Sequence, residues 1–404
     1  MNKTVRYSIL SLLLLCCSLL TAAIEKKEWT FLVYLAGANS LSDFAYADLA
    51  EMMKVGSNDK VNVIVYFTAY ESNGAKTTKR LYVLKDSILQ VSPTTVEDSG
   101  SIETLKRAIE WMIAQYPADN YYIGLWNHGG GILNKARSPL RGVCYDDETG
   151  SFLTDRDCLE GITYAKALND GKNIGIVAVD ACLMNMLEFA FTISSCSDFL
   201  VASEETIPGD GFDYERVLTP LAQGLVAPRT FAQHIVQAYS ATYAGTSDYT
   251  LAALDQARIA PIITNLHQIA AILTEGLRGS QKATVRKYIK MSLSGIPAFS
   301  DGSYVDLLSF YKKLAYYATR LGLAKDKITK LQQLLMQGEG YINAAVIAKA
   351  LSANYKNAGG ISLYFPSQSI DSSYANLYWT EHNPFMLQLL KQYITPSSFF
   401  SFLN

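Results

Sequence analysis

The feature that most constrains the fold is the regular alternation of apolar, β-branched runs with amphipathic segments of helical period. The runs that predict core strands lie at residues 29–37, 61–69, 120–126, 173–179 and 198–205, and a hairpin arm at residues 78–85 predicts a sheet edge. The segments that predict helices between them lie at residues 41–56, 102–116, 153–168 and 184–193. Strands that alternate with helices pair in parallel through right-handed crossovers, so helices cover both faces of the sheet. The sequence therefore predicts an α/β fold with a mostly parallel central sheet.

The pattern changes after about residue 250. Two short runs, "TLAALD" (250–255) and "GGISLYFP" (359–366), predict strands, and the segments between them are mainly amphipathic helices. No flexible linker and no internal repeat divides the chain. We expect residues 24–250 to form the α/β core and residues 251–404 to form a mainly helical C-terminal domain with short strands, packed onto the first.

The N-terminus carries a targeting signal. Lys3 and Arg6 precede the apolar stretch "ILSLLLLCCSLLTAA", which is short for a membrane span and ends in small residues. Thr21 and Ala23 suit cleavage by signal peptidase before Ile24. The sequence therefore predicts a signal peptide at residues 1–23 and an exported mature protein, either secreted or periplasmic.

A lipid anchor or a retained leader is the alternative, with the protein then held at a membrane surface. A lipoprotein would begin at Cys17, but Cys16 stands before it where a small Gly, Ala or Ser is usual. The chain has a formal net charge of −2 and no basic block, which argues against a nucleic-acid partner. We expect no membrane contact beyond this N-terminal anchor.

Four cysteines follow the leader, and in an exported chain they could form two disulfides. They are Cys144, Cys158, Cys182 and Cys196. No C-x-x-C pair with metal-ligand spacing occurs. If Cys182 is a free nucleophile, at most one disulfide can form and one other thiol is left over.

Two strand ends carry groups that a buried strand does not need. His128 lies in "WNHGGG" after the third predicted core strand, and Cys182 lies in "VDACLM" after the fourth. Consecutive parallel strands are often neighbours, and ligands bind at the carboxyl ends of such strands, so the thiol and the imidazole are expected to face each other. A Cys–His pair is the minimum for thiol acyl transfer. We also expect Cys182 to open a helix whose N-terminus lowers the thiol pKa, and the N–H groups of Cys182 and Gly129 to hold an oxyanion.

Each of these residues also has a structural interpretation. A single His is usually structural and a single Cys is usually a buried apolar thiol; the pairing of His128 with Cys182 favours catalysis. Asp180 could cap the helix that begins near Cys182, contact substrate, or do both. Asp210 lies between glycines in "PGDG", where a turn role is the alternative to substrate contact.

Other polar groups are expected to be structural or solvated. These are His234, His267, His382, Glu204 and Glu205. The two glutamates could also bind a cation or a basic substrate. Cys158 is expected in the middle of a helix, with its side chain in the protein core.

"WNHGGG", "VDACLM" and the following "SEETIPGDGFDY" resemble the clostripain family of cysteine peptidases, in the caspase-like clan with gingipains, legumain and separase. The likeness extends from about Trp29 to "GGISLYFP". It implies a caspase-like three-layer α/β/α sandwich, with His128 as general acid/base and Cys182 as nucleophile.

The resemblance also implies a substrate class and a set of properties. Members of the family cleave after Arg or Lys, and Asp180 and Asp210 match the acids of the specificity pocket. No cofactor is required, although calcium stimulation and self-cleavage between the His and Cys segments are frequent in the family. We expect a monomer that acts on peptide or protein substrates.

The loop at residues 132–152 is polar and contains glycine and proline, which is typical of an exposed, cleavable segment. Its basic residues are Lys135, Arg137 and Arg141. Pro139 disfavours cleavage near Arg137, because proline restricts the preceding residue and lacks an N–H. Arg141, followed by the small Gly142, is the predicted self-cleavage site.

These observations predict an exported cysteine endopeptidase. Two other functions stay open on the same framework. A catalytically silent binding protein would keep the fold but would not need both His128 and Cys182, and a thiol-dependent amidase or acyltransferase would share their chemistry.

Overall fold

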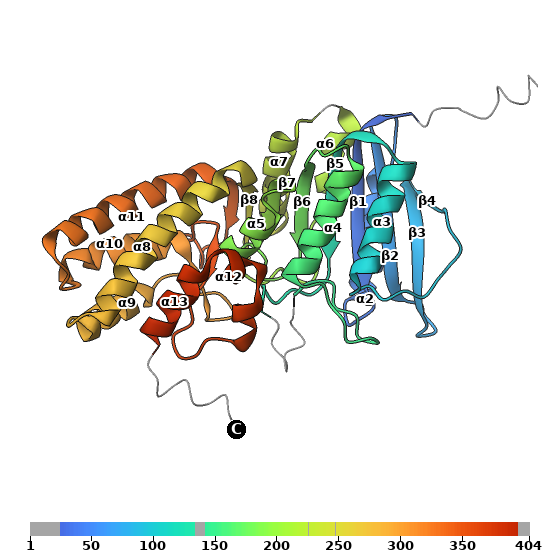
Figure 1. Ribbon diagram of the computed structural model, residues 1–404. Helices are drawn as coiled ribbons and strands as arrows, with labels where there is room; N and C mark the ends of the chain where they lie inside the picture. Colours follow the sequence, from blue (N-terminus) through green and yellow to red (C-terminus); the bar gives the residue numbers. More distant parts are fainter. Residues whose placement is uncertain (1–24, 134–141, 225, 247, 395–404) are drawn as a thin grey trace, which may run out of the picture.

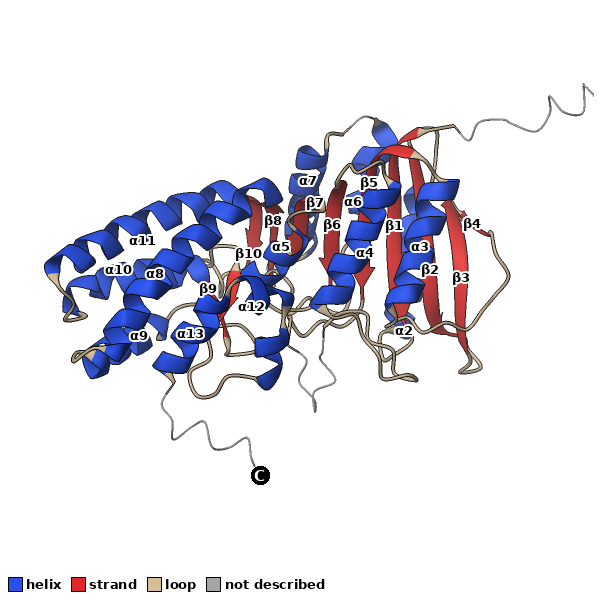
Figure 2. Ribbon diagram, viewed as in Figure 1, coloured by secondary structure: helices blue, strands red, loops and turns tan. Residues whose placement is uncertain are grey.

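The computed structural model describes residues 25–133, 142–224, 226–246 and 248–394. Its centre is a nine-stranded sheet with the order β10-β8-β7-β6-β5-β1-β2-β3-β4 (Figures 1 and 2). The strands are β1 (Lys27–Gly37), β2 (Val61–Tyr70), β3 (Lys76–Leu84), β4 (Ser87–Gln90), β5 (Ala118–Trp126), β6 (Ile174–Asp180), β7 (Ser197–Ala202), β8 (Thr250–Asp255) and β10 (Val346–Leu351). The five central strands, β7, β6, β5, β1 and β2, pair in parallel. The two strands at each edge, β8 and β10 on one side and β3 and β4 on the other, pair in antiparallel orientation.

Helices cover both faces of the sheet. One face carries α3 (Ile102–Gln115), α4 (Asp155–Leu168) and α5 (Leu187–Ile193), and the other carries α2 (Ser42–Val55), α6 (Tyr214–Gln223) and α7 (Pro228–Thr242) (Figure 1). Side chains of β1 alternate between the two hydrophobic cores, with Leu32 and Tyr34 on the α3 side and Phe31 and Val33 on the α2 side. This three-layer arrangement confirms the predicted α/β/α fold.

Local signals explain where several helices begin. The Ser101 side chain accepts a hydrogen bond from the Glu103 N–H at the start of α3. Thr154 and Asp157 form a capping box at the start of α4. No helix in the described part of the chain is long and apolar enough to cross a membrane.

The second half is mainly helical but also extends the central sheet. Its elements beyond β8 and β10 are η1 (Gln256–Arg258), α8 (Ile259–Arg278), α9 (Lys282–Leu293), β9 (Tyr304–Asp306), α10 (Leu307–Tyr317), η2 (Ala318–Arg320), α11 (Lys325–Ala345), β11 (Ser362–Tyr364), η3 (Ser372–Asn376), α12 (Tyr378–His382) and α13 (Pro384–Tyr393). The predicted strands at 250–255 and 359–366 correspond to β8 and β11, whereas the sequence pattern missed β9 and β10. A domain boundary at residue 250 stays a prediction, because β8 and β10 belong to the same sheet as the core strands.

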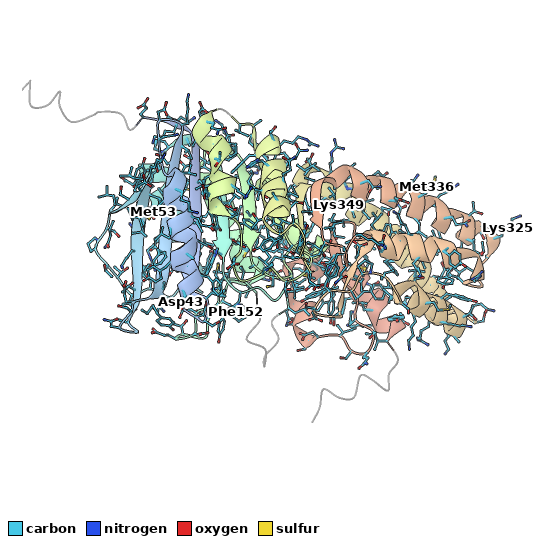
Figure 3. The ribbon with its side chains drawn as sticks, turned by 180° about the vertical axis from the view of Figure 1, so that it is seen from behind. Asp43, Met53, Phe152, Lys325, Met336 and Lys349 are labelled. Carbon is cyan, nitrogen blue, oxygen red and sulfur yellow. The ribbon has the colours of Figure 1, made fainter. Side chains whose placement is uncertain are left out.

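The molecule is elongated along the sheet. Seen from behind, Asp43 and Met53 of α2 lie at one end, while Lys325 and Met336 of α11 lie at the other (Figure 3). The carboxyl ends of β5 and β6, which carry the predicted site, lie between these ends.

Candidate active site

The two strands that precede the predicted His–Cys pair are neighbours in the sheet. β5 and β6 pair in parallel with Trp126 opposite Asp180, and the Asn127 N–H continues the ladder by donating to the Asp180 carbonyl over 3.3 Å. The loops that carry His128 and Cys182 therefore leave the same edge of the sheet side by side, as the sequence predicts.

Gly129 joins the two loops by direct contact. A Cβ atom at this position would lie 2.3 Å from the Cys182 carbonyl oxygen and 2.8 Å from the Cys182 nitrogen. Real Cβ atoms do not come this close to backbone, so a glycine is required for the backbone after His128 to lie against the loop that carries Cys182.

The His128 ring is partly buried and has a polar partner that the sequence did not indicate. Its Nε2 lies 2.9 Å from the Ser40 hydroxyl, on the loop that follows β1. Burial lowers the pKa of His128, and the carboxylate of Asp147 acts in the opposite direction. The net shift is downward, so the imidazole is neutral at neutral pH and can accept a proton.

Cys182 is partly buried in a turn after β6. The Ile207 N–H donates to its Sγ over 3.3 Å. Burial raises the pKa of the Cys182 thiol; the Ile207 and Gly129 N–H groups oppose this shift, and the charges of Asp180 and Glu205 add to it. The thiol is therefore protonated at rest.

The expectation that Cys182 opens a helix is wrong. The helix α5 begins at Leu187, its N-cap is Met186, and Leu183 adopts a positive φ of 64°. Cys182 lies in the turn before the helix, so a helix N-terminus does not lower the pKa of its thiol. For the same reason Asp180 does not cap this helix.

Asp180, two residues before Cys182, is buried, and its Oδ2 accepts two hydrogen bonds. Its Oδ2 accepts hydrogen bonds from the Phe212 N–H and from the Tyr214 hydroxyl, both at 3.0 Å. Burial raises the pKa of Asp180 to about 7, although both hydrogen bonds act to lower it. Gly211, at φ 59°, packs against this carboxylate, because a Cβ there would lie 2.9 Å from Oδ2.

Asp210 is exposed and lies in the turn next to Gly211. The Gly211 N–H donates to the Pro208 carbonyl over 2.9 Å, so the turn interpretation of "PGDG" holds for the backbone. The side chain of Asp210 is close enough to raise the pKa of the neighbouring Asp48 and Tyr243.

A third acid of this region, Asp48 of α2, was missed by the sequence interpretation. It is buried, and its Oδ2 accepts a hydrogen bond from the Trp126 indole N–H over 2.6 Å. Burial, followed by the charge of Asp180, raises the pKa of Asp48 to about 9. No Lys or Arg of the described residues forms an ion pair with Asp48, Asp180 or Asp210. In the described part of the chain, these three carboxyl groups therefore lie near one another without a Lys or Arg to balance their charge.

Glu204 and Glu205 are not the solvated pair that the sequence suggested. Both are buried after β7. Glu205 accepts hydrogen bonds from the Ser300 N–H and the Tyr355 hydroxyl, and Glu204 accepts one from the Gly360 N–H over 3.1 Å. The two glutamates therefore attach segments of the second half of the chain to the end of β7, next to the nucleophile loop.

The three remaining histidines have contacts of their own, and the three remaining cysteines are buried. His234 contacts the Arg216 carbonyl, His267 stacks on Phe385, and His382 contacts the Tyr378 carbonyl. The other three cysteines are buried, and all four thiols after the leader are free. In the part of the chain that the structure describes, no group of three or more Asp, Glu, His or Cys side chains could hold a metal ion.

The predicted self-cleavage site, Arg141, lies outside the described residues, as do Lys135 and Arg137. The chain on both sides of this segment is attached to the core. Leu133 is buried, and Val143 pairs with Gly129 and with Leu153.

Comparisons with known proteins identify the family of the chain. The model of the clostripain family of peptidases matches residues 33–392. Clostripain of Hathewaya histolytica is 27% identical over 228 residues, which are 50% of this chain and 43% of that protein, so the match spans less than half of the relative.

Two crystal structures share the fold over almost their whole length. One is a secreted C11 cysteine protease from Bacteroides thetaiotaomicron bound to an irreversible peptide inhibitor, with a TM-score of 0.62, 22% identity, and 90% of this chain and 99% of that chain covered. The other is an inactive zymogen C11 protease from Parabacteroides distasonis, with a TM-score of 0.64, 18% identity, and 89% and 99% covered. With a family match over most of its length, the chain belongs to the clostripain family of cysteine peptidases.

Proposed function

We propose that this protein is an exported cysteine endopeptidase that cleaves peptide bonds after Arg or Lys. The observation that carries the proposal is the contact between Gly129 and the Cys182 backbone, which joins the His128 loop and the Cys182 loop at one edge of the sheet. Export rests on the leader at residues 1–23, whose removal would leave Ile24 as the first residue.

The mechanism follows from the protonation states of the pair. Because burial favours the neutral thiol and the neutral imidazole, the proton moves from Cys182 to His128 as Sγ attacks the carbonyl carbon of the substrate. The carbonyl oxygen becomes an oxyanion, which the N–H groups of Gly129 and Cys182 stabilise. The tetrahedral intermediate collapses to a thioester, and the leaving amine takes the proton from His128.

Water completes the cycle. His128, now neutral again, removes a proton from a water molecule as the water oxygen attacks the thioester carbon. The second tetrahedral intermediate expels the Cys182 sulfur, which regains its proton from His128. The products are a new carboxyl end, a new amino end and unchanged enzyme.

The acids beside the nucleophile support a basic P1 residue. The charges of Asp180 and Asp210 both raise the pKa of Asp48, and burial raises the pKa of Asp48 and of Asp180. An incoming guanidinium or ammonium group would supply the missing positive charge, form charge-assisted hydrogen bonds and favour ionised carboxylates. Such a site stabilises a cationic side chain more than a neutral one of the same size.

Cleavage-site profiling tests the activity. Protein substrates are digested, and the new ends are identified by mass spectrometry with and without a thiol-reactive inhibitor. We expect new ends that follow Arg or Lys and disappear with the inhibitor. Hydrolysis of small amides without new peptide ends would instead support the amidase function.

Replacement of Asp210 by Asn is expected to lower kcat/KM for Arg substrates by about tenfold to a hundredfold, because a charged hydrogen bond contributes ~1.5–3 kcal/mol. Asp180→Asn should act in the same direction. The measurement compares P1 Arg with P1 Ala in otherwise identical peptides. Asp198→Asn, at the opposite end of β7, is the control and should leave the Arg preference unchanged. Unchanged Arg-over-Ala discrimination in both site variants would place the specificity pocket elsewhere.

Self-cleavage is expected between Arg141 and Gly142. Because Leu133 and Val143 are held in the core, a cut between them would leave both halves of the sheet joined by strand pairing. Intact-mass spectrometry should show two fragments for the wild type and one intact chain for Arg141→Gln. Arg137→Gln is the matched control. Pro139 disfavours cleavage after Arg137, so this variant should still be cut after Arg141. A wild-type chain that is fully active and uncut would remove this step.

A further inference from the structure

We propose that Lys76 and Asp146 act as a positioning pair for His128. In this interpretation the pair fixes the segment at residues 142–153, here called the 142–153 loop, which in turn holds the His128 ring in its catalytic orientation. The inference rests on the proposed function in the role of His128 as acid/base, and the reason given below for the anchor rests on the proposed cut after Arg141.

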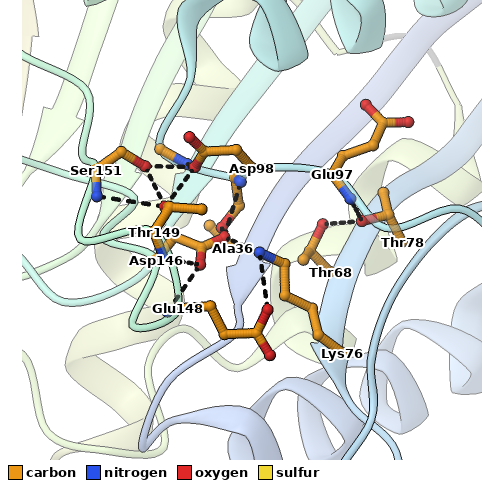
Figure 4. A network of polar contacts seen from close by, with 12 residues as sticks. Ala36, Thr68, Lys76, Thr78, Glu97, Asp98, Asp146, Glu148, Thr149 and Ser151 are labelled. Carbon is orange, nitrogen blue, oxygen red and sulfur yellow. Dashed lines mark hydrogen bonds and ion pairs between the residues drawn. The ribbon is translucent and has the colours of Figure 1, made fainter.

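The pair is an ion pair in the interior of the protein. Lys76 Nζ, at the start of β3, lies 2.7 Å from Asp146 Oδ2, and the side chains are only 3% and 0% exposed (Figure 4). The N–H and hydroxyl of Ser99 donate to the same oxygen over 3.0 and 2.9 Å. Burial acts to raise the pKa of Asp146, but the bonds from Lys76 and Ser99 outweigh it and leave the pKa below its ordinary value. A buried ion pair is a costly way to stabilise a fold, so a role beyond stability is reasonable.

The other atoms of Asp146 shape the 142–153 loop itself. Oδ1 accepts hydrogen bonds from the N–H groups of Glu148 and Thr149 over 3.2 and 3.4 Å. The hydroxyls of Thr149 and Ser151 then donate to Asp98, as Figure 4 shows. The loop is thus closed around the Asp146 carboxylate. Lys76 balances this buried charge and also lies 3.7 Å from Oε2 of the half-exposed Glu148 in the same loop (Figure 4).

The residues on either side of Asp146 connect the loop to His128. The Tyr145 carbonyl accepts hydrogen bonds from the side-chain amides of Asn127 and Asn39, both at 2.9 Å, and Asn127 directly precedes His128. The Asp147 N–H donates over 3.0 Å to the carbonyl of Ala38, which lies two residues before Ser40, the partner of the His128 ring.

The 142–153 loop also contacts the chain after His128 and its ring. Val143 pairs with Gly129. Asp147 is the one charged group of the described residues that has a resolved effect on the pKa of His128. The loop therefore touches the residue before His128, the residue after it, and the loop that carries its ring partner.

The position of this loop in the chain explains why it would need such an anchor. It begins directly after the segment 134–141, in which the proposed self-cleavage lies. Once the chain is cut at Arg141, Gly142 becomes a free end, and the Lys76–Asp146 pair keeps the following residues against His128. An intact chain does not need the pair to the same degree.

The test measures the His128 ring directly and does not depend on peptidase activity. Imidazole NMR signals of the Cys182→Ala protein are titrated with pH, and His128 is assigned from the spectrum of a His128→Asn variant. Lys76→Met should lower the pKa of His128 further, because Asp147 is no longer held beside the ring. His234, His267 and His382 should titrate as in the parent protein and serve as internal references.

Kinetics with an intact Cys182 give the second measurement. Lys76→Met should lower kcat by roughly tenfold to a hundredfold with little change in KM, because small displacements of a catalytic group have effects of this size. Lys79→Met is the matched control, since Lys79 lies on the same strand but pairs with Glu71 at the surface. This control should leave both kcat and the His128 titration unchanged.

A second variant covers the case in which Lys76→Met does not fold because it leaves a buried charge unpaired. The double variant Lys76→Met/Asp146→Asn removes both charges and keeps the hydrogen bonds from Ser99, and it should show the same shift of the His128 titration. A folded variant, single or double, with a lower Tm but an unchanged His128 titration and an unchanged kcat would reduce the pair to a structural role and overturn the proposal. If the proposed peptidase activity fails while the titration shifts, the positioning of the ring still stands.

Discussion

Replacement of Cys182 by Ala is expected to abolish peptidase turnover, with a loss of roughly a millionfold in kcat. Only a thiol can form the thioester, and among the described cysteines Cys182 is the one that is not fully buried. The measurement is hydrolysis of an Arg peptide, followed over days, together with a thermal unfolding curve. The Ala variant should keep the wild-type fold, because the thiol is only partly buried.

Cys196→Ser is the matched control for this prediction. Cys196 is buried and its thiol donates to the Ile193 carbonyl over 3.2 Å, which a hydroxyl can also do. The control should keep full turnover. An irreversible thiol reagent should modify Cys182 in the wild type and in the control and stop their turnover, whereas Cys182→Ala has no thiol at this position to modify. Substantial hydrolysis by a folded Cys182→Ala protein would contradict the assignment of the nucleophile.

Replacement of His128 by Ala is expected to lower kcat by roughly 10⁴-fold or more, because the acid/base and the nucleophile act as one unit. The dependence of wild-type activity on pH tests the same role of His128. Activity requires neutral His128, whose pKa burial lowers, so activity should be retained as pH falls through about 6.5 and be lost only below it.

His234→Ala is the control for the general effect of removing a histidine. His234 lies in α7, and its ring contacts the Arg216 carbonyl of α6 rather than a group of the His128 or Cys182 loop. It should leave kcat and the acid limb of the pH profile unchanged. A His128→Ala protein that loses stability but keeps its turnover would show that His128 is structural.

The alternation of strands and helices is the part of the fold that the sequence predicts best, because burial on both faces gives apolar runs that are easy to recognise. Consecutive parallel strands are often neighbours in a sheet, and this rule correctly predicted that His128 and Cys182 follow neighbouring strands. By contrast, β10 follows α11 without a break and pairs with β8 across a long stretch of chain. Its side chains are mostly half-exposed, so no local pattern marks it as a strand.

The errors in the site have local and long-range causes. The apolar residues after Cys182 fit a helix, but Leu183 adopts a left-handed conformation that nothing in its side chain favours, so α5 starts later. Asp48 lies in the middle of an ordinary amphipathic helix, and only the fold brings it to Trp126. The pairing of Lys76 with Asp146 is likewise visible only once β3 and the 142–153 loop meet.

The pairing of β8 with β10 sets an order of events for folding. All strands from β1 to β8 can assemble from the first part of the chain, but β10 becomes available only after the helices from α8 to α11 have been made or exported. Until then β8 is an edge strand with buried residues Leu251 and Ala253 and a row of unpaired backbone groups. A chain at this stage of folding can already bring the loops of His128 and Cys182 together, while the open edge of its sheet can still pair with a second molecule.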